Sequence, residues 1–123
     1  MNVEVPSTCG NAPRHQIITQ VLAAIYRKDL PALEQWLSPD VRWIVAGIQP
    51  LDGLDAVREW ILAIPETRTV QFLSVLTHGA EGSADGQSYD ANNSVTRFSH
   101  VLRFASAGKT AKIKQIRSYF VKQ

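Results

Sequence analysis

One histidine of the chain lies among apolar residues at the spacing of a β-strand. In the segment FSHVLRF (98–104), strand alternation puts His100 on the same face as three apolar side chains. An imidazole titrates near neutral pH, so at such a place it could act as a general acid or base, or donate a hydrogen bond to a ligand carbonyl. The structural alternative is a buried histidine whose ring is satisfied by a neighbour such as Ser118.

The other polar candidates have simpler structural interpretations. His78 ends an apolar strand and is expected at a turn or rim. Asp85 is expected at a bulge, and Asp90 in a hairpin turn. Asp52 and Asp55 surround a helix start, where capping and the helix dipole explain them. No cysteine and histidine cluster has the spacing of a metal site, so the sequence predicts neither a metal nor a cofactor.

The composition is that of one globular domain. Of 123 residues, 45% are hydrophobic and 20% are charged, which excludes disordered, collagen-like and coiled-coil classes. The single Cys9 cannot form an internal disulfide, which favours a reducing compartment, and we expect a cytoplasmic protein. Neither a signal peptide nor a membrane-spanning run is indicated.

The hydrophobic periodicity predicts an α+β fold. Helices are expected early and strands late, so that an antiparallel sheet packs its apolar face on the helices. We expect a flexible N-terminal segment over 1–12 and a single domain over 13–123. The predicted elements are a helix of about fifteen residues starting near Pro13, a short helix through Leu33, Trp36 and Leu37, a strand over 41–45, a helix over 54–64, and strands over 70–77, 83–90, 95–105 and 112–121.

Several local motifs occur in a characteristic order, namely KDLPAL (28–33), DVRW (40–43), PLDGLDAV (50–57), the His100 strand and KIKQIRSY (112–119). Together they resemble the NTF2-like superfamily, in its SnoaL-like and ketosteroid-isomerase-like branch, which has a cystatin-like α+β cone. The resemblance implies a curved, mostly antiparallel sheet around the long first helix, with three N-terminal helices and an apolar pocket open at one end. It also implies a homodimer formed through the outer face of the sheet.

Only part of the isomerase site has matching polar residues in this sequence. The isomerase relatives use a carboxylate base, a tyrosine from the first helix and a protonated aspartate, and that enzyme is a known example of pKa tuning. These three positions fall on Val45, Val21 and His100. Valine can neither accept a proton nor donate a hydrogen bond through its side chain. We therefore expect no steroid isomerisation by that mechanism.

The leading hypothesis is a small-molecule-binding protein with an apolar pocket for a hydrophobic ligand. As an enzyme it would be of the isomerase, hydrolase or cyclase type, acting on a small hydrophobic carbonyl or epoxide compound with His100 as acid or base. The alternative is a non-catalytic binder or carrier. The residues expected to line the pocket are Val21, Trp43, Val45, Trp60, Phe98, Leu102, Ile116, Ser118 and Phe120, with Tyr26 as a further aromatic candidate.

The charge is unevenly divided along the chain. Residues 91–123 carry seven basic and no acidic residues, whereas all eleven acidic residues lie in 1–90. Alternation directs Arg97, Arg103, Arg117 and Tyr119 to the outer sheet face, where the resemblance implies the dimer contact. A basic interaction module is the third hypothesis, but the positive residues lie on both faces and no aromatic pair typical of RNA-binding sheets is present, which disfavours nucleic acid.

Overall fold

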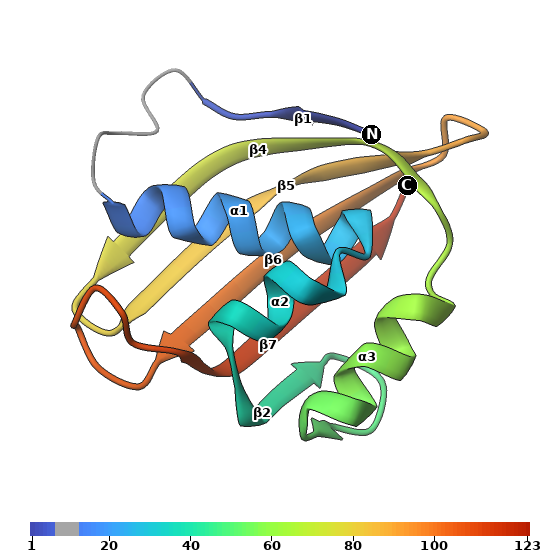
Figure 1. The fold of residues 1–123 in the computed structure, drawn as a ribbon. Helices are drawn as coiled ribbons and strands as arrows, with labels where there is room; N and C mark the ends of the chain where they lie inside the picture. The colour runs from blue at the N-terminus through green and yellow to red at the C-terminus, as the bar shows by residue number, and fades with distance from the viewer. Residues whose placement is uncertain (7–12) are drawn as a thin grey trace.

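Three helices lie against one curved sheet (Figure 1). The computed structural model describes residues 1–6 and 13–123, so Cys9 lies outside the described residues. The helices are α1 (Pro13–Arg27), α2 (Leu30–Trp36) and α3 (Leu54–Ala63). The strands are β1 (Asn2–Glu4), β2 (Leu37–Val45), β3 (Leu51–Asp52), β4 (Thr67–His78), β5 (Glu81–Asp90), β6 (Val95–Phe104) and β7 (Ile113–Lys122).

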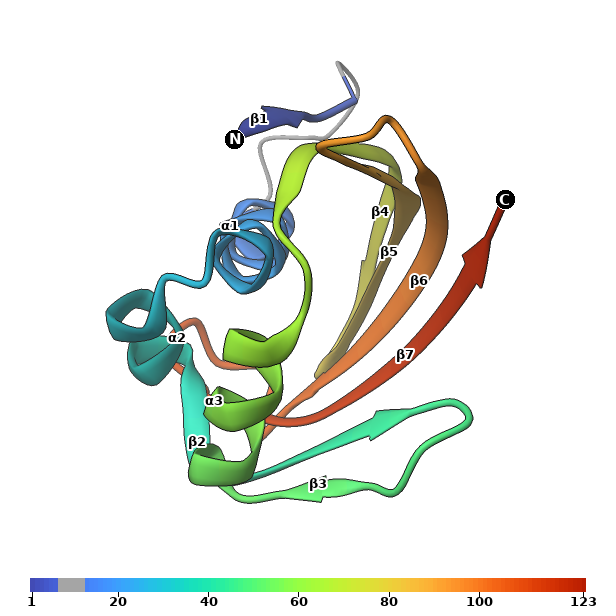
Figure 2. The ribbon, with the colours of Figure 1, turned by 90° about the vertical axis from the view of Figure 1, so that its right-hand side faces the viewer.

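The sheet is mixed, with a long antiparallel centre. Its strand order is β1-β4-β5-β6-β7-β2-β3. Strands β4 to β7 pair antiparallel in sequence order, whereas β1 joins β4, and β2 joins β7, in parallel. Figure 2 shows the long strands bending along one side with the helices on the other. The α+β cone expected from the sequence is confirmed.

Local sequence features set where the helices begin and end. The apolar stripe of α1 is buried through Ile18, Leu22 and Ile25. At the start of α2, the Asp29 side chain accepts from the backbone N–H of Ala32 at 3.4 Å, as an N-cap does. Helix α3 ends before Pro65, which cannot continue a helix.

The structure differs from the predicted elements at three places. Leu37 opens β2 instead of ending the second helix, because it pairs with Ile113 at the start of β7. Strands β1 and β3 were not predicted; they have three and two residues, too few for a periodicity to show. Strand β1 pairs along β4, inside the segment from which no regular element was expected.

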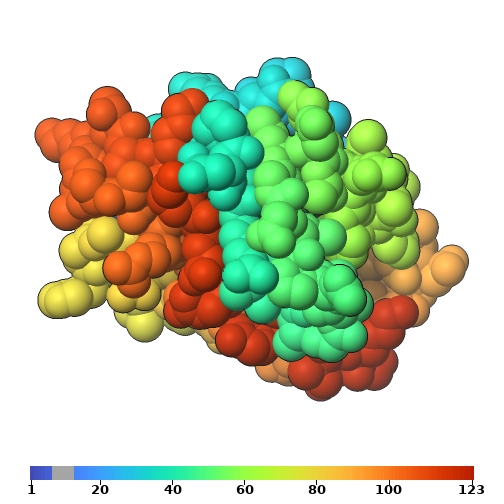
Figure 3. Space-filling model, turned by 90° about the horizontal axis from the view of Figure 1, so that it is seen from below, coloured from blue at the N-terminus to red at the C-terminus, as the bar shows by residue number. Residues whose placement is uncertain are grey.

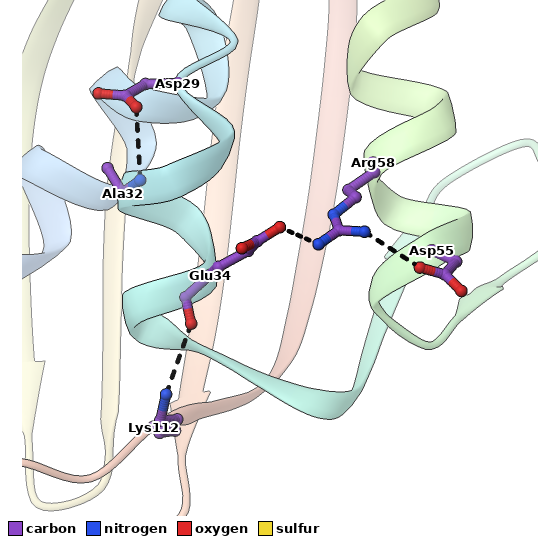
Figure 4. Close-up of polar contacts among 6 residues, drawn as sticks. All are labelled: Asp29, Ala32, Glu34, Asp55, Arg58 and Lys112. Carbon is purple, nitrogen blue, oxygen red and sulfur yellow. Dashed lines mark hydrogen bonds and ion pairs between the residues drawn. The ribbon is translucent and has the colours of Figure 1, made fainter.

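Figure 4 shows polar contacts that connect α2 with α3 and with the segment before β7. Arg58 of α3 binds Glu34 of α2 and also Asp55 at 3.2 Å. Lys112 donates to the backbone oxygen of Gln35 at 3.1 Å. These contacts are partly exposed, so each adds little stability, but together they tie α2 to α3 and to the segment before β7. In Figure 3 the β2–β3 segment lies between α3 and β7.

The sheet bends at a bulge where β4 faces a glycine. The β4–β5 register shifts between Phe72 and Ser74, opposite Gly86 and Asp85. A bulge bends its strand, and a glycine lets a neighbouring backbone approach. A Cβ on Gly86 would lie 2.0 Å from the backbone oxygen of Gln71. The curvature of the sheet therefore needs a residue without a side chain at position 86.

We expect Gly86→Ala to lower the free energy of unfolding by about 3 kcal/mol, because the added methyl group forces β4 and β5 apart. Gly108→Ala is the control: that glycine is exposed, and its added Cβ would meet only the Ser106 hydroxyl, at 3.3 Å. Urea unfolding measures both. Equal stability of the two variants would contradict this account of the bend.

Candidate functional site

A cavity of about 300 Å³ lies between the inner face of the sheet and the ends of α1 and α3. Its inner part is aromatic and its rim is polar. The lining residues are Ile25, Tyr26, Trp43, Trp60, Ile64, Pro65, Glu66, Thr67, Ser88, Asp90, Ser94, Thr96, His100, Phe120 and Lys122. This volume is at the lower end of the range typical of small-molecule sites, roughly 300–1,000 Å³.

Strand alternation brings His100 to this cavity. On β6, His100 and its apolar neighbours Phe98 and Leu102 are buried, whereas Arg97 and Arg103 are exposed. The imidazole is completely buried and packs against two aromatic rings, with centroid distances of 4.9 Å to Phe98 and 5.5 Å to Phe120. The inward orientation predicted for His100 is confirmed.

Both ring nitrogens of His100 have a hydrogen-bonding partner. Nδ1 lies 2.6 Å from Ser118 Oγ, and Nε2 lies 3.0 Å from Tyr26 Oη. Ser118 Oγ also accepts a hydrogen bond from Trp43 Nε1 at 2.8 Å. The four side chains form one buried chain of hydrogen bonds, which we call the Trp43–Tyr26 chain. It is assembled from β2, β7, β6 and α1.

The pairing register of the sheet assembles this chain. His100 lies directly opposite Ser118 in the antiparallel β6–β7 pair, so their side chains share one face. In the parallel β2–β7 pair, Trp43 lies opposite Ile116 and Val45 opposite Ser118. Tyr26 stands near the C-terminal end of α1, which crosses over this part of the sheet. The expected Ser118–His100 contact is therefore present.

Burial keeps the two titratable side chains of the Trp43–Tyr26 chain, His100 and Tyr26, uncharged. Removal from water lowers the pKa of His100 to about 3. The same desolvation raises the pKa of the Tyr26 phenol far above its ordinary value. At neutral pH the site therefore offers a neutral imidazole and a protonated phenol. Both act as hydrogen-bonding groups and not as charges.

The wall of the cavity at the end of α3 is held by one lysine. Lys28 Nζ donates to the backbone oxygens of Leu62 at 3.2 Å and Ile64 at 2.6 Å. It also lies 3.7 Å from the Glu66 carboxylate. Cations are favourable at the C-terminal end of a helix, where carbonyl groups lack partners. Lys28 thus fixes the segment 64–67 that lines one side of the cavity.

Some of the residues expected in the pocket line the cavity and others do not. Trp43, Trp60 and Phe120 do so together with His100; the two indole rings meet edge to face at 4.9 Å. The remaining six are buried in the sheet and helix core, and none is a lining residue: Val21, Val45, Phe98, Leu102, Ile116 and Ser118. The cavity thus lies nearer the end of α1 than the aligned positions indicate.

The tyrosine from the first helix is the residue that the isomerase alignment missed. That alignment put the tyrosine position at Val21, which is buried in the core. Tyr26, five residues later, brings a phenol to His100 instead. Its spacing of four from Leu22 on the buried stripe of α1 is the sequence signal that could have found it.

The remaining polar candidates have the local contacts of structural residues. Asp90 accepts from the backbone N–H groups of Asn92 at 2.8 Å and Ser94 at 2.9 Å, which confirms its hairpin role, and it also lies at the cavity rim. Asp85 accepts from Ser74 across the bulge. His78 is exposed at the end of β4, and Asp52 pairs with Arg42 at 3.0 Å.

The described residues, 1–6 and 13–123, contain no group of three or more histidine, cysteine, aspartate or glutamate side chains placed to hold a metal ion. Within the same residues, no helix has both the length and the apolar character needed to cross a membrane.

The fold and the site together define a class of protein, which is an α+β cone with an aromatic cavity and a buried pair of polar side chains. A family model of the SnoaL-like domain matches residues 18–113. The chain therefore belongs to the SnoaL-like family. A search of curated protein sequences finds no significant match.

Solved structures with the same fold come from several kinds of protein. An NTF2-like protein of unknown function from Burkholderia pseudomallei has a TM-score of 0.72 at 22% identity, covering 89% of this chain and 92% of its own. The epoxide hydrolase/cyclase-like enzyme SalBIII of salinomycin pyran-ring formation has a TM-score of 0.71 at 14% identity, with coverages of 92% and 94%. A ketosteroid isomerase-like protein from Kribbella flavida has 0.75 at 8% identity, with coverages of 88% and 77%.

The buried histidine predicts how stability depends on pH. Because the folded pKa of His100 lies below the ordinary value near 6.5, the unfolded chain binds a proton there that the folded chain does not. The free energy of unfolding should therefore fall as pH drops from about 6.5 toward 3. We expect a loss of about 2 kcal/mol between pH 7.5 and pH 5 in urea unfolding.

The variant His100→Gln should remove most of this pH dependence, whereas His78→Gln, at an exposed position, should keep it. If both variants kept the slope of the parent protein, His100 would not be the neutral buried group described above.

Proposed function

We propose that the protein binds a small hydrophobic compound in the cavity, with a polar atom of the ligand facing Tyr26 and His100. The observation that carries this proposal is the pairing of two neutral polar side chains with an otherwise aromatic inner wall. Apolar surface supplies the binding free energy, and a few placed polar groups fix the orientation of a ligand. The cavity volume suits a compound of one or two rings.

A catalytic role for the same site is the second proposal. The reaction would be proton transfer on, or water addition to, a small hydrophobic carbonyl or epoxide compound, with His100 as the acid or base. Support comes from a titratable ring at the cavity wall and from the fold shared with an epoxide hydrolase/cyclase-like enzyme. The low pKa of His100 argues against efficient general-base catalysis, because it makes the imidazole a weak base.

Binding is tested by filling the cavity. Single- and double-ring apolar compounds should raise the melting temperature and change the fluorescence of Trp43 and Trp60. Ser88→Phe places a ring in the cavity and should weaken binding at least about tenfold, the effect of losing about 1.4 kcal/mol. Thr110→Phe, in the exposed turn before β7 and outside the cavity lining, is the control and should bind like the parent.

Equal weakening by Thr110→Phe, or saturable binding that Ser88→Phe leaves intact, would place the ligand outside this cavity. Catalysis is tested separately. Any compound of a carbonyl and epoxide panel that is turned over should lose turnover in His100→Gln. Unchanged turnover would remove His100 from the mechanism. Saturable binding without turnover is the result that a carrier gives.

We also propose that two copies associate through the outer face of the sheet. This face carries exposed apolar side chains at Leu73, Leu76 and Val121, and Tyr119 is half exposed. A shallow groove of about 460 Å³ is lined by Leu73, Tyr119 and Val121, with Asp85 and Arg97 on its walls. In a two-fold dimer the same surface patch of both copies is in contact, so Asp85 of one copy can face Arg97, Arg103 or Arg117 of the other.

The cytoplasmic location stays a prediction from the single cysteine.

The dimer is tested by charging its apolar centre. The double variant Leu73→Glu with Val121→Glu should be monomeric in analytical ultracentrifugation, because two carboxylates would lose their water in the interface. Leu62→Glu, at an exposed leucine of α3, should remain a dimer. A monomeric parent protein, or a dimer that survives the double change, would contradict this arrangement.

A further inference from the structure

We propose that Ser118, held by Trp43, is a positioning residue that fixes the tautomer of His100 and so directs the Tyr26 hydroxyl hydrogen into the cavity. The site would then present a hydrogen-bond donor and select ligands that carry an acceptor oxygen. The ligand class rests on the proposed function, whereas the tautomer can be measured in the protein without any ligand.

The indole of Trp43 is the donor at the buried end of the Trp43–Tyr26 chain. An indole nitrogen donates a hydrogen bond and cannot accept one. Trp43 Nε1 lies 2.8 Å from Ser118 Oγ, so the serine oxygen must be the acceptor in that contact. The single hydrogen of the serine hydroxyl cannot point toward Trp43. Its other partner among the described residues is Nδ1 of His100, at 2.6 Å.

Two tautomers of the neutral imidazole have to be compared. With the hydrogen on Nε2, the Ser118 hydroxyl donates to Nδ1, and Nε2 donates to the Tyr26 oxygen. With the hydrogen on Nδ1, that nitrogen donates to Ser118, whose own hydrogen then has no acceptor among the described residues. Ser118 is completely buried, and a buried donor without a partner is strongly disfavoured.

In the first tautomer, only the hydroxyl hydrogen of Tyr26 has no acceptor among these four side chains, and this residue lines the cavity. Tyr26 Oη then accepts from His100, so its own hydrogen is free to donate elsewhere. Tyr26 lines the cavity, where a ligand or water can accept this bond. Each bond in the Trp43–Tyr26 chain also polarises the next, which strengthens the last donor. An acceptor oxygen is therefore the ligand atom that this wall fits.

The tautomer is measured by ¹⁵N NMR of the ligand-free protein with labelled histidine. We expect His100 to carry its hydrogen on Nε2 and to show a hydrogen-bonded, unprotonated Nδ1. Ser118→Ala removes the donor to Nδ1, so this single tautomer should give way to a mixture. Ser118→Thr keeps the hydroxyl and should restore it. Trp43→Phe should shift the population in the same direction as Ser118→Ala, whereas Trp36→Phe, outside the chain of hydrogen bonds, should not.

The ligand preference is measured with three bicyclic compounds of similar shape. 1-Indanone carries an acceptor oxygen, indane carries no polar atom, and indole carries only a donor. We expect 1-indanone to bind about fivefold more tightly than the other two, the contribution typical of one hydrogen bond. The variant Tyr26→Phe keeps the ring without its hydroxyl and should remove the preference.

The two measurements separate the possible failures. A hydrogen on Nδ1 in the parent protein, or a tautomer population unchanged by Ser118→Ala, would overturn the positioning role. Equal affinity for 1-indanone and indane would overturn the acceptor preference. If none of the three compounds bound while the tautomer results held, the proposed function would fail and the positioning role would stand.

Discussion

The structure depends on one constraint, which is that an imidazole excluded from water must have partners for both of its nitrogens. His100 meets it with Ser118 on the neighbouring strand and Tyr26 on the helix above the sheet. The first contact requires the β6–β7 register, and the second requires α1 to end over the same part of the sheet. A shift of either element would leave a buried polar atom without a partner, at a cost of about 1–3 kcal/mol. The polar centre of the cavity and the packing of the fold therefore support each other.

Much of the fold could be predicted because its signals are local. The apolar stripe of α1, the proline after α3 and the alternation of β6 each involve neighbouring residues, and each was confirmed. Alternation alone put His100 on the inner face and Arg97 and Arg103 on the outer one. The order of elements and the short motifs then indicated the family, which the SnoaL-like domain match to residues 18–113 shows.

The candidate site was harder to predict because it joins residues far apart in the chain. Tyr26 and His100 are 74 residues apart, and Trp43 and Ser118 are 75 apart. No periodicity reports such contacts; they follow from the strand register and from where a helix ends. Positions expected in the pocket were also displaced: Val21 and Leu102 are in the core, while Ile64 to Thr67, Ser88 and Thr96 line the cavity. A phenol thus reaches the cavity from Tyr26, although the position aligned with the isomerase tyrosine is Val21.

A curved sheet and the helices α1 and α3 form a small aromatic cavity, and the inner polar side chains that line it, Tyr26 and His100, are neutral at physiological pH. The most direct test is a crystal structure of the protein with a small aromatic ketone. The account predicts the ring against Trp60 and Phe120, with the carbonyl oxygen at hydrogen-bond distance from Tyr26 Oη. A ketone bound on the outer sheet face, or bound in the cavity with its oxygen turned to the rim, would contradict it.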